Sequence, residues 1–586
     1  MIKRLLSFLD ASPVNFLAVK NISKELEKNG FRRINPQEPL GKVEAGDKFF
    51  VTKNDSSIYA FQIGKKPLAD AGFHMICAHC DSPTFRIKPN AEMLCEGGIV
   101  KLNTEVYGGP IMSTWFDRPL TLAGRVIVKG ESAMNPQTLL LHVKRPLLQI
   151  SNLAIHFNRQ VNDGVKLCKQ KDVLPILGII NDELEKNGFR RMNPQEPLGK
   201  IEAGEKFFVT KNDSSIYAFQ IGKKPLADAG FHMLCAHCDS PTFRIKPNAE
   251  MLCEGGIVKL NTEVYGGPIM STWFDRPLTL AGRVIVKGEN AMNPQTLLLH
   301  VKRPLLQISN LAIHFNRQVN DGVKLSKQKD VLPILGIIND ELEKGNLLMN
   351  VITDELNIQK EDVLDFDLYL ADATPACTFG VHDEFISSGR LDDLSMCWAG
   401  VEAMIASDAN DTTQVLAIFD NEETGSQTKQ GAGSPFLSYM LQRIALAQSG
   451  TEEAYYQAVE RAFMISADNA HAWHPNYSEK FDPTNHPKLG GGPVIKFNAA
   501  QKYASDAVSA AIFANICDAA SVPCQRFVNH SDVAGGSTLG NILASSIPLK
   551  GVDMGNAILA MHSCRETGSV IDHEYCVKAF TKFYQL

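Results

Sequence analysis

Residues 74–89 read HMICAHCDSPTFRIKP, and residues 232–247 read HMLCAHCDSPTFRIKP, so the two stretches differ at one position. In each, an apolar run leads into a histidine that is followed two residues later by an aspartate. A strand ending at the proline would put the histidine and the aspartate on one face. A carboxylate so placed can orient a metal-bound imidazole. The chain therefore carries two candidates for half of a metal site, His79 with Asp81 and His237 with Asp239.

The same stretch offers an alternative, because Cys77 and Cys80 form a C-x-x-C pair. Such a pair can bind zinc or carry redox chemistry. No paired histidines at zinc-finger spacing accompany it in the sequence. We therefore expect free thiols at these positions.

The quoted stretch belongs to a long internal repeat. The tetrapeptide ELEK begins at residues 25, 183 and 341, and both intervals are 158 residues (183 − 25 and 341 − 183). A first block, residues 25–182, and a second block, residues 183–340, align without a gap. They differ at six positions: Ile34/Met192, Val43/Ile201, Asp47/Glu205, Ile76/Leu234, Ser132/Asn290 and Cys168/Ser326. Solenoid units are 20–50 residues long, so this repeat is not a solenoid. A long block copied almost verbatim is what an unequal crossover, or an error in assembling the sequence, would leave. Removing one block leaves 586 − 158 = 428 residues.

The two parts of the chain have different secondary-structure patterns. Each block begins and ends inside a helical pattern (NFLAVKNISKELEKNGF and DVLPILGIINDELEKGNLL), and between them KFFVTKNDSSIYAFQIG, GGIVKLNTEVYGG and LTLAGRVIVKG predict strands joined by turns. After residue 345, strand-like TQVLAIFD and GPVIKFN alternate with helical EEAYYQAVERAFMI and SDAVSAAIFANICDAA. This alternation predicts an α/β sheet with flanking helices.

Composition excludes several classes of protein. A hydrophobic content of 44% is typical of a globular protein with a large core, and a net charge of −6 argues against nucleic acid as a partner. No apolar run is long enough to span a membrane. The N-terminal MIKRLLSFLDASPVNF predicts a helix and no signal peptide. Thirteen cysteines without a regular framework favour reduced thiols and a cytoplasmic location.

The strongest chemical signal is carried by residues that occur once. In VLAIFDNEETGS an apolar run leads into the adjacent Glu422 and Glu423, whose carboxylates repel each other unless a cation or a proton neutralises them. Asp392 and Asp393 precede a helical pattern, where the helix dipole alone would favour acids. Apolar runs also lead into Asp468 and His562. Since α/β sheets gather ligands at the carboxyl ends of their strands, these residues are expected at one rim.

This rim would supply His, Asp, Glu, Asp and His, which are the donors that two zinc ions accept. The set consists of His237 or His79, Asp392, Glu423, Asp468 and His562. Glu422 is left over beside the metals to act as a base.

In this order, AHCDSP, SGRLDDL, DNEETGS, SADNAHAWHPNY, GGPVIK and AMHSCRE resemble the aspartyl aminopeptidase family of di-zinc exopeptidases. The resemblance covers the equivalent of all 428 residues; only the second block departs from the family pattern. It implies a zinc-exopeptidase α/β domain interrupted by a β-rich dimerisation domain. It also implies peptide substrates with an acidic N-terminal residue, and dimer-based homo-oligomers that reach a dodecamer.

The resemblance also implies roles for single residues. Asp392 would bridge two zinc ions, with the AHCDSP histidine and Asp468 on one, and Glu423 and His562 on the other. Glu422 would be the general base, supported by the aspartate of AHCDSP, Asp239 or Asp81. Substrate-binding candidates complete the set: Lys496, His156 or its repeat equivalent His314, and His474.

Two arrangements could accommodate the duplication. In the first, residues 1–182 are a surplus fragment, residues 183–247 start the catalytic domain, residues 248–365 form the β-rich domain, and residues 366–586 complete the catalytic domain. In the second, residues 1 to about 90 join the catalytic sheet instead. We favour the first, because the second block is contiguous with the downstream sheet, and so expect His237 to be the ligand.

Two other functions remain open from the sequence. A related di-zinc carboxypeptidase or deacylase would keep the metal site and change the substrate, although GGPVIK and NLAIHFNR speak against it. The duplication could also leave an inactive, misassembled subunit.

Overall fold

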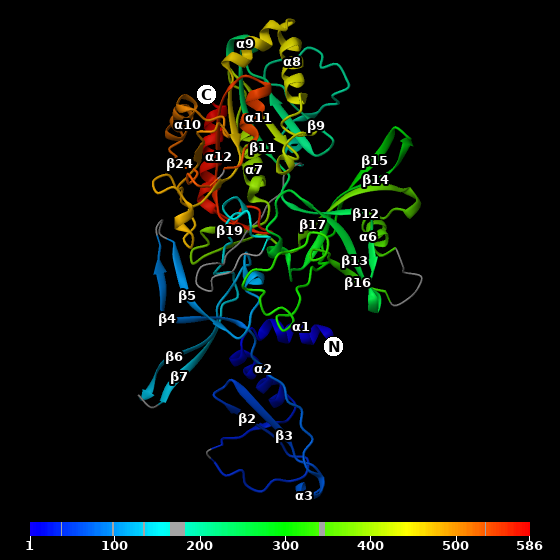
Figure 1. The fold of residues 1–586 in the computed structure, drawn as a ribbon, viewed down its shortest axis with the longest axis vertical. Coiled ribbons are helices and arrows are strands. Elements are labelled where there is room, and N and C mark those ends of the chain that lie inside the picture. Colours follow the sequence, from blue (N-terminus) through cyan, green and yellow to red (C-terminus); the bar gives the residue numbers. More distant parts are fainter. Residues whose placement is uncertain (37, 96–98, 133–134, 164–181, 339–345, 534) are drawn as a thin grey trace. The chain divides into compact units, whose positions relative to one another are not determined.

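The computed structural model describes residues 1–36, 38–95, 99–132, 135–163, 182–338, 346–533 and 535–586. The chain divides into two compact units. The first unit comprises residues 1–91, 103–110 and 120–148, and the second comprises residues 92–102, 111–119 and 149–586. Figure 1 gives the elements of both.

A nine-stranded mixed sheet forms the centre of the second unit, in the order β24-β23-β25-β21-β11-β20-β10-β9-β8. Its strands are β8 (Arg190–Arg191), β9 (Lys206–Lys211), β10 (Ser215–Gln220), β11 (Phe231–His237), β20 (Thr413–Phe419), β21 (Phe463–Ala467), β23 (Val494–Phe497), β24 (Gln525–Val528) and β25 (Lys550–Gly555). Strand β11 pairs in parallel with β20 on one side and β21 on the other. Its sequence is apolar almost throughout, as a central strand covered on both faces requires.

Helices cover both faces of this sheet (Figure 1). On one face lie α7 (Leu391–Ile405), α10 (Ala507–Ala519) and α12 (Val570–Tyr584); on the other lie α8 (Phe436–Ser449), α9 (Glu453–Arg461) and α11 (Leu539–Ser546). Successive residues of β11 alternate between the two cores, with Leu234 packed in the first and Met233 in the second. The predicted α/β sheet with flanking helices is confirmed.

A separate antiparallel sheet of six strands, in the order β15-β14-β17-β12-β13-β16, follows β11 in the chain and has its own core. The strands are β12 (Thr242–Leu252), β13 (Ile257–Tyr265), β14 (Leu278–Asn290), β15 (Asn293–His300), β16 (Ile334–Ile337) and β17 (Val363–Asp372). The helical prediction over DVLPILGIIN in the second block is wrong at β16, which pairs with β13. Its isoleucines favour an extended edge strand. Helix α6 begins later and spans Leu347–Leu356.

Short elements complete the second unit. They are α4 (Asp182–Lys186), α5 (Leu226–Ala229), β18 (Cys377–Phe379), β19 (Phe385–Ser388), β22 (Ala470–His471), β26 (Ala557–Ile558) and β27 (Glu566–Ser569), with 3-10 turns η2 (Met112–Trp115), η3 (Ile155–Phe157), η4 (Glu254–Gly256), η5 (Met270–Trp273), η7 (Lys360–Asp362), η8 (Glu422–Thr424) and η9 (Ser478–Lys480). The helical prediction at the junction of the blocks is met by α4; residues 172–181 and 339–345 lie outside the described residues.

In its described residues, the first unit has small sheets. Its elements are α1 (Ile2–Ala11), α2 (Asn15–Lys28), β1 (Arg32–Arg33), β2 (Lys48–Lys53), β3 (Ser57–Gln62), α3 (Leu68–Ala71) and the hairpin β6 (Ala123–Ser132) with β7 (Asn135–His142). The paired strands β4 (Thr84–Leu94) and β5 (Val100–Tyr107) run into the second unit. Residues 72–83 contain neither helix nor strand. The prediction of a strand at His79 is therefore wrong. The equivalent strand β11 forms between β20 and β21, and these two partners occur once in the chain. Among the described residues, no helix has the length and apolar character needed to cross a membrane.

Candidate metal centre

Acidic and histidine side chains meet at the carboxyl edge of the large sheet. Strand β11 ends at His237, β20 is followed by the turn containing Glu423, and β21 is followed by Asp468. These three strands are parallel neighbours, so their ends lie at the same edge. The first turn of α7 adds Asp392, which is joined to the next residue by a cis peptide bond. His562 comes from the turn between β26 and β27, and so the prediction that it ends a strand of the rim is wrong.

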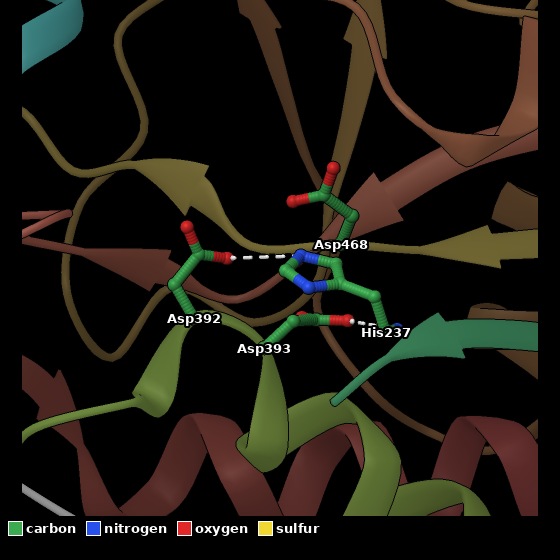
Figure 2. A group of neighbouring side chains, drawn as sticks. All are labelled: His237, Asp392, Asp393 and Asp468. Atoms are coloured by element: carbon green, nitrogen blue, oxygen red, sulfur yellow. Dashed lines mark hydrogen bonds and ion pairs between the residues drawn. The ribbon is translucent and has the colours of Figure 1, made fainter. Parts of the chain in front are cut away.

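Two overlapping groups of potential ligand atoms result. One contains His237, Asp392, Asp393 and Asp468, and is shown in Figure 2; the other contains Asp392, Glu423 and His562. Within each group the ligand atoms lie within 4.8 Å of one another. Asp392 belongs to both, with Oδ1 at 3.8 Å from Nε2 of His237 and Oδ2 at 3.7 Å from Nε2 of His562. This is the geometry of a carboxylate that can bridge two cations.

The environment of these acids fits a divalent cation. Oδ1 of Asp392 and Oε1 of Glu423 are buried and have no hydrogen-bond partner among the described residues. Burial raises the pKa of both carboxyls well above its usual range, and the charges of Asp468 on Asp392 and of Asp392 on Glu423 raise it further. A cation would offset this repulsion, and the mixed nitrogen and oxygen donors suit zinc.

Asp239 contacts both His237 and the turn that carries Glu422 and Glu423. Nδ1 of His237 lies 3.1 Å from the carbonyl oxygen of Asp239 and 3.4 Å from its Oδ1, which directs Nε2 toward the ligand group. The same carboxylate accepts hydrogen bonds from the backbone N–H groups of Glu422 (3.0 Å) and Glu423 (3.1 Å) and from the hydroxyl of Tyr265 (2.8 Å). One side chain thus fixes both the histidine and the turn that carries the two glutamates.

Two carboxylates, Glu566 and Asp393, have supporting contacts that the sequence did not predict. Glu566 accepts hydrogen bonds from the backbone N–H groups of Asp392 (3.0 Å) and His562 (2.9 Å), and so fixes a member of each group. Asp393 accepts one from the backbone N–H of His237 at 3.2 Å. Glu566 ends the motif AMHSCRE, but the sequence assigned it no role, since that role depends on a contact between segments that are far apart in the chain.

Glu422 and Lys496 flank the ligand groups. Burial raises the pKa of Glu422 to about 8; the charge of His237 opposes this shift, and that of Asp468 adds to it. Lys496 is buried with its Nζ 3.4 Å from Oδ1 of Asp468, and it donates a hydrogen bond to the carbonyl oxygen of Asn469 at 3.1 Å. Although burial alone would lower it, the pKa of Lys496 is raised by Asp468.

A histidine of the first block also reaches this centre. The ring of His156 lies 4.5 Å from that of His562 and 5.1 Å from that of His471. Burial lowers the pKa of His156 well below its usual range, so the ring is neutral. His474 is buried nearby, with Nε2 at 3.3 Å from the carbonyl oxygen of Ser151.

The remaining candidates lie elsewhere. His79 is 86% exposed at its side chain, against 1% for His237, and its neighbours are Asp81 and, through Asp81, Tyr107. His314 is exposed. Within the described part of the chain, neither histidine belongs to a group of potential metal ligands.

This fold and this ligand set define a metalloenzyme of the zinc-exopeptidase class. The family model described as aminopeptidase I zinc metalloprotease (M18) matches residues 8–187 and residues 176–584. The chain belongs to the M18 family of zinc metalloaminopeptidases. Probable M18 family aminopeptidase 2 of Clostridium acetobutylicum is 51% identical over 407 residues, covering 70% of this chain and 94% of the relative. The protein of the same name in Clostridium novyi is 49% identical over 407 residues, with the same coverage.

Solved structures agree with this assignment. The cryo-EM structure of the Ape4 and Nbr1 complex matches with a TM-score of 0.67 and 36% identity, covering 69% of this chain and 81% of that one. The mApe1 structure from Chaetomium thermophilum matches with a TM-score of 0.62 and 29% identity, covering 69% and 91%. The S. cerevisiae mApe1 dodecamer, at a TM-score of 0.60 and 24% identity over 69% and 90%, supports the fold.

Proposed function

We propose that this aminopeptidase removes acidic N-terminal residues from peptides with two zinc ions at one centre. The observation that carries the proposal is the position of Asp392, whose two carboxylate oxygens face different histidines. His237 and Asp468 would complete the first zinc site, and Glu423 and His562 the second.

The chain's own groups suit peptide hydrolysis. Zinc held here would make water reactive near neutral pH and polarise a peptide carbonyl. Glu422, next to Glu423 in the turn after β20, would be ionised once cations offset the neighbouring carboxylates, and would take the proton of the attacking water and deliver it to the leaving amine. Asp239 would hold Glu422 and the His237 ring in place through the hydrogen bonds described above.

Substrate selection would depend on positive charge beside the metals. Lys496 is the buried cation next to Asp468, and it would bind the carboxylate of an N-terminal aspartate or glutamate. His156 would contact the bound peptide from the first block, with His474 holding the backbone of Ser151 on the same segment. His314, being exposed, would serve only the site of another chain.

We extend the proposal to location and assembly. The structure describes twelve of the thirteen cysteines and all are free thiols, which supports a cytoplasmic protein. Because a related structure is a dodecamer, we also propose a homo-oligomer for this chain.

The test combines zinc content with release of single amino acids from peptides that begin with Asp, Glu, Ala or Leu. We expect two zinc ions per chain and fastest release of Asp and Glu. Glu422→Gln should retain zinc and lose roughly 100- to 10,000-fold in kcat, the range for a general base. Lys496→Met should lose the preference for Asp and Glu. Release from the carboxyl terminus, or no release from a fully zinc-loaded chain, would contradict the proposal.

A further inference from the structure

Residues of the two blocks contact each other reciprocally. The backbone N–H of Met112 donates to Oδ1 of Asn320 at 3.0 Å, and the backbone N–H of Met270 donates to Oδ1 of Asn162 at 2.9 Å. Met270 is the repeat equivalent of Met112, and Asn320 that of Asn162, since each pair is 158 residues apart (270 − 112 and 320 − 162). Exchanging the two blocks therefore converts the first contact into the second.

A second pair of contacts has the same relation. Arg118 donates to the carbonyl oxygen of Asp275 at 2.8 Å, and its equivalent Arg276 donates to the carbonyl oxygen of Asp117. The 3-10 turns η2 and η5, which are repeat equivalents, lie against each other. All these residues belong to the second unit.

Reciprocal contacts between identical surfaces define a two-fold, isologous interface. In this protein both halves of the interface belong to one chain. In an exact two-fold pair, the segments next to the interface would have equivalent surroundings in both blocks. The candidate metal centre occurs once, however, and only the first-block segment lies against it. The two copies of that segment must therefore differ in their contacts and burial.

The first-block segment lies on the rim of the metal centre. Leu153 and Phe157 pack into a core with Trp473 and Phe481, and the hydroxyl of Ser151 lies 3.1 Å from that of Thr567. Ser563 donates to the buried carboxylate of Asp117 at 2.6 Å. The equivalent second-block residues, Leu311 and Phe315, are exposed to solvent.

We propose that the first block is a built-in second protomer. Residues 111–119 and 149–163 occupy, within the chain, the face through which two single-block chains would pair by a two-fold axis. They complete the rim of the metal centre with His156 from the same polypeptide. The partner that fits this face is therefore a copy of the block itself, already supplied by the duplication.

The test is a disulfide across the proposed axis in the full-length protein. The variants are Met112→Cys with Asn320→Cys and, as the symmetric second pair, Asn162→Cys with Met270→Cys. Each is compared with its two single variants, oxidised mildly, separated without reductant, and the linked peptides are identified by mass spectrometry. The readout is independent of peptidase activity and so of the proposed function.

We expect both linkages to form in chains that still migrate as one polypeptide of 64.5 kDa. A covalent two-chain product through these positions would overturn the proposal, because the contact would then join separate molecules. The absence of both linkages above the single-cysteine controls would also overturn it, because the blocks would then not face each other.

Discussion

The two copies of NLAIHFNR, at residues 152–159 and 310–317, are identical in sequence and opposite in environment. In the first, Leu153 and Phe157 are 5% and 8% exposed; in the second, Leu311 and Phe315 are 57% and 81% exposed. The quoted metal-site stretch behaves in the reverse way, since His237 is buried in β11 and His79 is exposed outside any strand. In both comparisons, one copy of the repeated stretch is buried against residues that occur once in the chain, and the other copy is exposed.

The hexapeptide SIYAFQ makes the same point for a strand. In β10 all six residues are buried between β9 and β20, whereas in β3 none is fully buried, and among the described strands β3 pairs with β2 alone. Local propensity cannot distinguish the copies, because it is the same for both. The difference comes from tertiary partners, which is why burial must be argued from neighbours and not from pattern alone.

The largest expected difference between the copies is at the metal ligand. His237→Ala should remove one zinc ion per chain and lower peptidase activity by more than the roughly 10- to 100-fold typical of losing a supporting residue. His79→Ala should retain both ions and change activity by less than about 2-fold, as expected for an exposed substitution. Zinc analysis and peptide hydrolysis on both variants measure this. An equal loss from His79→Ala would mean that the first block supplies the ligand.

The next largest difference is in the free energy of unfolding, at Phe157 and its repeat equivalent Phe315. Phe157→Ala deletes a buried ring and should lower the free energy of unfolding by about 3 kcal/mol. Phe315→Ala removes an exposed ring and should stay within about 0.5 kcal/mol of the parent. Urea unfolding of the two variants gives the comparison. Similar losses would show that the second copy is also buried in solution.

A smaller effect is expected at the aspartate behind the histidine. Asp239→Asn weakens the support of His237 and of the Glu422 turn, and should cost roughly 10- to 100-fold in zinc affinity or activity. Asp81→Asn lies in the first unit and serves as the matched control. Zinc competition with a chelator and steady-state kinetics check both. If both substitutions left zinc binding unchanged, the supporting role of Asp239 would be wrong.

The last difference between the copies is the change in stability per pH unit caused by Asp117. Burial raises the pKa of Asp117 to about 7, while hydrogen bonds from Ser563 and Asn152 oppose the shift. The folded pKa lies above the ordinary value of 3.8, so the folded state holds the extra proton between these values, and raising the pH through this window removes stability. The contribution should fall by about 1.4 kcal/mol per pH unit up to about pH 7.

Asp117→Asn should abolish this part of the pH dependence, and Asp275→Asn, at the equivalent position, should retain it. Unfolding midpoints measured from pH 5 to pH 8 give the slopes. A slope that is unchanged in Asp117→Asn would exclude this carboxyl as its source.

Much of the fold could be predicted from the sequence. The hairpins of each block and the alternation after residue 345 follow from local patterns that survive in the structure, and acids after apolar runs located Glu423 and Asp468. The strand β16 could not be predicted, because an edge of the six-stranded sheet overrides a helical pattern. The role of Glu566 could not be predicted either, because it depends on hydrogen bonds from the backbone N–H groups of Asp392 and His562, which the fold brings to it.

The spacing of the ligands has a consequence for synthesis. The candidate ligands His237 and His562 are 325 residues apart (562 − 237), a stretch that takes a ribosome on the order of tens of seconds to translate. The first block emerges 158 residues earlier still, yet its histidine is not the one that lies with the acids. The order of synthesis therefore does not decide which copy joins the group. The candidate ligand group as a whole cannot assemble until almost the entire chain has left the ribosome.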